Sequence, residues 1–114
     1  MPIILGVVNA NIVDTALEVK TSPTVFYGAK VSNRGSSRAF IQLHNVATGS
    51  VTPGTSVPAI SIAVEPDSVN VDYALPVGVG PITFATALSV IATTTPVGAT
   101  ATEASMVDLN SFIG

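Results

Sequence analysis

The chain has 114 residues, a net charge of −3 from seven acids and four bases, and charged side chains at only 10% of its positions, against about 25% in an average soluble protein. This length fits a single small domain with one hydrophobic core. Four scattered cations cannot neutralise a run of phosphates or line a membrane-surface helix, so the composition argues against nucleic-acid and membrane partners. The lack of cysteine rules out disulfides and thiolate metal sites.

The first part of the chain predicts short β-strands, because β-branched residues dominate it and Pro or Gly interrupts it about every 10 residues. The apolar run at residues 3–8 has no basic residue before it, so we interpret it as a first strand and not as a signal peptide. Strands are then expected at residues 13–21 and 24–32. In the latter, Val25, Tyr27, Ala29 and Val31 occupy every second position and should share one face.

A polar loop at residues 33–37 predicts a β-hairpin between the strand at 24–32 and a partner strand at 38–46. Gly35 within this loop can supply the positive φ that tight hairpin loops need. In the partner strand, Ala39, Ile41 and Leu43 should point inward.

Turn residues at 48–56 separate this region from a strand expected at residues 57–64, in which Ile60, Ile62 and Val64 are in register. A turn at residues 66–68 leads to a strand at 69–73. A bend rich in Pro and Gly at residues 76–81 then precedes the longest predicted strand, residues 82–93.

The strand predicted at residues 82–93 lies within an uncharged stretch that runs from Tyr73 to Thr102. One of its faces is ordinary core, formed by Ile82, Phe84, Leu88 and Val90. The opposite face carries mostly small, uncharged side chains, and we predict it as a contact surface for another subunit: Thr83, Ala85, Ala87, Ser89 and Ile91.

Together these elements predict one all-β domain over residues 1–114, a small antiparallel β-sandwich or a jelly-roll-like barrel. Residues 1–10 are expected to form an N-terminal arm or an edge strand. Residues 101–113 are expected to form a last strand or an arm, and the whole segment 101–114 is the candidate C-terminal arm.

No group of residues predicts catalysis, a cofactor or a metal site. His44 is the only histidine, and a lone histidine in a strand is best interpreted as half-exposed sheet surface, with an enzymatic role as the weaker alternative. Glu65, Asp67 and Asp72 cluster at a turn without the central glycine of a calcium loop, which favours a solvated acidic turn over a weak calcium contact.

Three segments resemble those of a known group of proteins: AKVSNRGSSRAFIQLHN, VPAISIAVEPDS and LPVGVGPITFATALSVIATT. Their order is similar to that in small β-sandwich virion proteins of tailed bacteriophages, of the head-decoration or fibre-associated kind, over residues 27–95. The resemblance implies a non-enzymatic capsid decoration or cement protein on the virion surface. It also implies a homotrimer seated on a major capsid protein. A tail, baseplate or fibre-associated host-attachment module is the alternative.

The predicted subunit contacts fall at the two ends of the chain, at the polar loop and on the face described above. Apolar ends can add a strand or an arm to a neighbour, and loop arginines are either solvated or paired with a neighbour's acid. The candidate interface residues outside the 82–93 strand are Ile3, Ile4, Leu5, Val7, Val8, Arg34, Arg38, Met106, Leu109 and Phe112.

Overall fold

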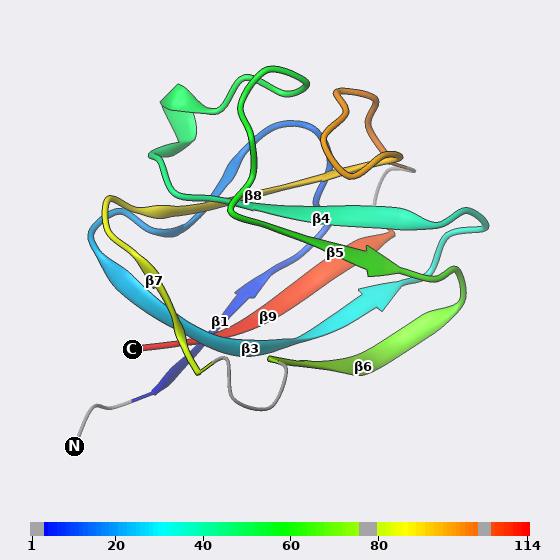
Figure 1. The fold of residues 1–114 in the computed structure, drawn as a ribbon. Helices are drawn as coiled ribbons and strands as arrows, with labels where there is room; N and C mark the ends of the chain where they lie inside the picture. Colours follow the sequence, from blue (N-terminus) through cyan, green and yellow to red (C-terminus); the bar gives the residue numbers. More distant parts are fainter. Residues whose placement is uncertain (1–3, 76–79, 103–105) are drawn as a thin grey trace.

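The structure, a computed structural model, describes residues 4–75, 80–102 and 106–114. Two antiparallel sheets pack face to face with the core between them (Figure 1). The five-stranded sheet has the order β1 (Leu5–Asn9), β9 (Val107–Ile113), β3 (Thr24–Asn33) and β6 (Ser68–Ala74), with β7 (Ile82–Phe84) also paired to β3. The four-stranded sheet has the order β2 (Leu17–Lys20), β8 (Leu88–Thr93), β4 (Ala39–His44) and β5 (Ile60–Val64), and a 3₁₀ turn, η1 (Thr48–Ser50), lies between β4 and β5.

The strand order is that of a jelly roll. The pairs β4–β5, β3–β6, β2–β8 and β1–β9 are nested in sequence, as if one long antiparallel hairpin had been wound around the core. The pairs β3–β9 and β4–β8 close each sheet, and β7 is an additional strand in the returning half. This order defines the double-sheet jelly-roll architecture, and it confirms the predicted all-β sandwich. In the described ranges, no helix is long and apolar enough to cross a membrane.

Aliphatic side chains from both sheets fill the core, together with two phenylalanines. Phe26 and Phe84 are fully buried, and their rings meet edge to face with centroids 6.4 Å apart. The predicted inward side chains Ala39, Ile41 and Leu43 are all buried in this cluster, so the two-residue alternation of this strand was interpreted correctly.

The predicted hairpin at residues 33–37 is wrong, because β3 and β4 belong to different sheets. The loop crosses from one sheet to the other, and the buried Asn33 side chain organises it. The Asn33 amide donates to the carbonyls of Ser37 (2.9 Å) and Val64 (3.1 Å), while its Oδ1 accepts the backbone N–H of Gly35 (3.0 Å). A polar turn sequence fits such a crossing as well as it fits a hairpin.

The strand predicted at residues 82–93 is two strands, β7 and β8, which lie in different sheets. The chain leaves the five-stranded sheet after Phe84 and enters the four-stranded sheet at Leu88. Phe84, Leu88 and Val90 are buried and Ile82 is half-buried, so the predicted core face is correct although the strand is not continuous.

The alternation predicted for β3 is interrupted by a bulge. Phe26 pairs with Ile113 and Gly28 with Phe112, so an extra residue lies between the two pairs. Gly28 has φ +146°, and a Cβ placed there would lie 3.0 Å from the carbonyl oxygen of Tyr73. As a result Phe26 faces the core together with Ala29 and Val31, and the predicted face of four alternate residues is wrong.

The two ends of the chain are strands. Residues 107–113 form β9, which lies between β1 and β3, so the C-terminal arm is wrong and the last strand is confirmed. β1 confirms the predicted edge strand. The strand expected at 13–21 is shorter, at Leu17–Lys20, and Ile3 and residues 76–79 of the expected bend lie outside the described residues.

Candidate assembly surface

β1 forms an exposed apolar edge of the five-stranded sheet. One side of the strand pairs with β9 from Leu5↔Ile113 to Asn9↔Leu109, and within the described residues no strand pairs with its other side. Ile4 and Leu5 are each 53% exposed and Val8 is 69% exposed, whereas Val7 packs against the core. Three of the predicted contact residues are therefore available to a partner.

Beside this edge, Phe112 lies between two glycines on the outer face of the sheet. The register places it opposite Gly6 of β1 and Gly28 of β3, and its ring lies 3.9 Å from the position of a Cβ on Gly6. An aromatic ring can compensate for strand glycines in this way. The half-buried Phe112 therefore extends the apolar surface that begins at Val8. Glycines inside two predicted strands were the sequence signal for this arrangement.

Three buried polar atoms on β1 and β9 have no hydrogen-bond partner among the described residues: Asn9 Oδ1, Asn110 Oδ1 and Ser111 Oγ. Each such atom costs about 1–3 kcal/mol of desolvation.

The two loop arginines form ion pairs within the chain. Arg34 bonds to Asp108, which lies on β9, and Arg38 Nε lies 2.7 Å from Glu65 Oε1. Partial burial raises the pKa of the Asp108 carboxyl, but hydrogen bonds from Arg34 and from the Asn11 backbone outweigh this and lower it. The same bond and charge raise the pKa of Arg34. Both arginines are exposed, yet each already has an acidic partner.

The small-residue face predicted as a subunit contact is mostly buried. Thr83 and Ala85 are exposed, but Ala87, Ser89 and Ile91 are buried, so for these three the prediction is wrong. The loops at residues 45–59 and 94–102 lie over β4 and β8 and cover this face (Figure 1), and Ser89 Oγ donates to the carbonyl of Val46 at 2.7 Å.

Among the predicted C-terminal contacts, Leu109 is fully buried and therefore cannot contact a partner. Met106 is half-buried and packs against the core. Phe112 alone of the three contributes to the outer face.

His44 is buried, which contradicts its predicted half-exposed position. Gln42 Nε2 donates to Thr93 Oγ1 (2.6 Å) and to the Gly98 carbonyl (3.2 Å), so its Oε1 is left as the acceptor for His44 Nε2–H at 3.0 Å. Thr93 Oγ1 in turn donates to the Thr95 carbonyl at 2.8 Å. The network attaches the 94–102 loop to the sheet, and sequence reasoning missed it because these polar residues resemble a solvated face.

Burial also lowers the pKa of His44 below its ordinary value of 6.5. As pH falls through 6.5, the unfolded chain therefore binds a proton before the folded one does, and stability that is present above this pH is lost below it. We expect a lower urea midpoint at pH 5.5 than at pH 7.5. His44→Gln should remove most of this difference, and an unchanged pH dependence in that variant would contradict the assignment.

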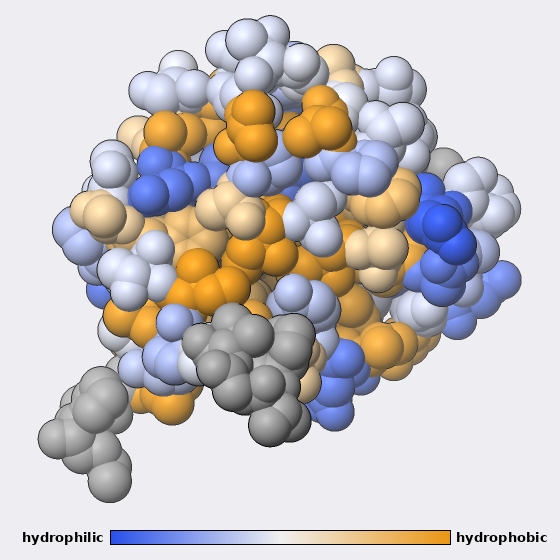
Figure 2. Space-filling view, viewed as in Figure 1, coloured by the Kyte–Doolittle hydropathy of each residue, from blue (hydrophilic) through white to orange (hydrophobic). Residues whose placement is uncertain are grey.

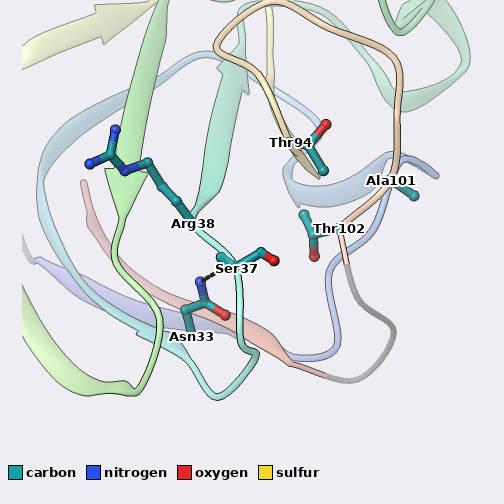
Figure 3. Close-up of a pocket in the computed structure, with 6 residues that line it drawn as sticks. All are labelled: Asn33, Ser37, Arg38, Thr94, Ala101 and Thr102. Carbon is teal, nitrogen blue, oxygen red and sulfur yellow. Dashed lines mark hydrogen bonds between the residues drawn. The ribbon is translucent and has the colours of Figure 1, made fainter.

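A pocket of about 240 Å³ lies at the end of the sandwich where the 33–38 crossing meets the 94–102 loop. It is lined by Asn33, Ser37, Arg38, Thr94, Ala101 and Thr102, and the carbon atoms of these residues supply most of the lining surface. The Arg38 guanidinium points away from the two threonines, and the Asn33 amide is engaged with Ser37 (Figure 3). The pocket therefore offers hydroxyl groups and no free charge directed into it.

A second apolar region lies on one face of the molecule. Figure 2 shows apolar side chains in a band across the middle of the face that carries β5, β6 and β7 in Figure 1. On β6, Val69 and Val71 are exposed hydrophobic residues. Sequence alternation found these valines but assigned them no exposure.

The acidic turn does not form a ligand set in the described residues. Glu65 pairs with Arg38, and Asp72 pairs with Lys30 at 2.6 Å. No group of three or more His, Cys, Asp or Glu side chains in the described ranges is arranged to hold a metal ion.

Comparison with known proteins finds no match among protein-family models, curated proteins or solved structures. The fold and the surface therefore define the class, a jelly-roll β-sandwich with an exposed apolar sheet edge.

Proposed function

We propose that this protein is a non-enzymatic structural component of a tailed-bacteriophage virion. In this role it decorates or cements the capsid, associates with further copies of itself and is seated on the major capsid protein. The observation that carries the proposal is the uncharged edge of the five-stranded sheet, where Ile4, Leu5 and Val8 are exposed.

The architecture and the charge of the chain support this role. Jelly rolls occur in viral capsid proteins, and also in lectins and cupins, so the fold alone does not decide between these classes. A chain with 10% charged residues relies little on charge to remain separate from its neighbours, which suits a protein that assembles once. The burial of its only histidine supports a non-enzymatic role.

The test is the copy number of the chain in purified particles of the source phage, measured by quantitative mass spectrometry. A number comparable to that of the major capsid protein is expected. Absence from the particles would overturn the proposal, and a few copies per particle would place the protein in the tail instead. The homotrimer implied by the resemblance is an alternative to the two-fold pairing proposed below, and the oligomeric state measured in solution decides between them.

The pocket favours a second candidate, a host-attachment module that binds a glycan. Ser37 and Thr94 carry hydroxyl groups in the lining of this pocket at the end of the sandwich, where loops of β-sandwiches often bind ligands. Binding of the purified protein to a glycan array, weakened by Thr94→Val, would support this candidate, and a blank array would remove it.

A further inference from the structure

Among the strands that end the two sheets in the described residues, β1 is the least protected against pairing. Sheet edges are normally blunted by charges, bulges or short polar strands. β2 carries Glu18 and Lys20 with a register shift between them, and β6 carries Asp72 and has a register shift in its ladder with β3. The exposed positions of β5 are the small residues Ser61 and Ala63. β7 pairs only with β3 and has just three residues.

β1 has none of these features. Its sequence, LGVVN, has no charge and no proline, and its ladder with β9 runs without a register shift. Leu5 and Val8 are both more than half exposed. The strand therefore offers unpaired backbone groups together with uncovered apolar side chains.

We propose that β1 pairs antiparallel with β1 of a second copy of this chain, around a two-fold axis at Val7. The pairing joins the two five-stranded sheets into one continuous sheet. Only in this register do all five residues of one β1 pair with the five residues of β1 in the other copy. It places the two Val7 residues opposite each other. It also puts Val8 of each copy opposite Gly6 of the other, beside the Phe112 ring that lies 3.9 Å from a Cβ position on that glycine.

The absence of charge on β1 favours a second copy as the partner, because two identical edges approach without any like-charge contact. Five paired residues form about four to six backbone hydrogen bonds, fewer than the roughly ten of a stable interface. The dimer should therefore be weak and reversible in solution, and populated above concentrations of about 10 μM.

Sedimentation equilibrium of the purified full chain tests this inference. We expect a concentration-dependent equilibrium between monomer and dimer. Val8→Lys should raise the dissociation constant at least about tenfold, since lysine on an edge strand opposes pairing. Val69→Lys is the matched control, because Val69 is 66% exposed on the other edge of the same sheet, and it should leave the equilibrium unchanged.

Val7→Cys provides a second test that depends on the register. The chain has no cysteine, so any disulfide must join two copies at this position. Directly opposed residues of antiparallel strands have Cα atoms about 4.5–5.5 Å apart, within disulfide range. Oxidation should therefore cross-link Val7→Cys several-fold faster than Val69→Cys.

A monomer at every concentration, a trimer, an equal effect of the two lysine variants or equal cross-linking would each overturn the inference. It does not depend on the virion role. A chain that is monomeric in solution but abundant in particles would overturn the strand pairing alone, and a dimer that is absent from particles would overturn the virion role alone.

Discussion

Replacement of Phe84 by alanine is expected to destabilise the protein by about 3–5 kcal/mol, the range for phenylalanine truncation in a packed core. The Phe84 ring is fully buried and lies edge to face on Phe26. It is carried by β7, a strand of only three residues that pairs with β3 over Thr24, Val25 and Phe26. With so short a ladder, the buried ring is the main attachment of β7, so its loss affects both the core and the strand.

A loss of this size is a large part of the 5–15 kcal/mol that stabilises a typical domain. Urea unfolding followed by far-UV circular dichroism should show a lower midpoint with a similar slope. Thr83→Ala is the control, since Thr83 is exposed on the same strand, and its effect should stay within about 0.5 kcal/mol. A loss below about 1 kcal/mol for Phe84→Ala would contradict the packing described for β7.

Local patterns in the sequence were sufficient to find most strands and one of their faces. The alternation of Ala39, Ile41 and Leu43 depends only on neighbouring residues, and all three are buried. The pairing of the strands was not accessible in this way. β1 meets β9 through Leu5↔Ile113, at opposite ends of the sequence, and turn residues such as those at 33–37 do not reveal whether the chain stays in one sheet.

The candidate surface was predicted only in part, because local patterns indicate which residues an edge strand exposes but not which residues the loops cover. Exposure of Val8 follows from its place in an edge strand, which the N-terminal pattern indicated. The burial of Ala87, Ser89 and Ile91 depends on loops that carry no periodic signal. In the sequence, the polar side chains of β4 and β8 resembled a solvated or partner-covered surface. In the structure, Gln42, His44 and Thr93 bond to one another beneath the chain's own loops.

Replacement of Gln42 by leucine is expected to cost about 2–4 kcal/mol, although the side chain keeps nearly the same volume. Leucine can neither accept the His44 N–H nor donate to Thr93 and to the Gly98 carbonyl. These buried groups would lose their partner, and each group left unsatisfied costs about 1–3 kcal/mol, partly relieved by relaxation. The effect should concentrate in the 94–102 loop, which this side chain attaches to β4.

Ser61→Ala is the matched control. Ser61 pairs with Gln42 across β4 and β5 and donates to the Pro96 carbonyl of the same loop at 3.0 Å, but it is exposed. Since water can replace an exposed hydrogen bond, this change should cost under about 1 kcal/mol. Hydrogen exchange of the Thr94 and Gly98 amides, which bond within the loop, should accelerate in Gln42→Leu and remain near wild type in Ser61→Ala. Equal exchange in the two variants would mean that backbone bonds, and not the buried network, hold the loop over the sheet.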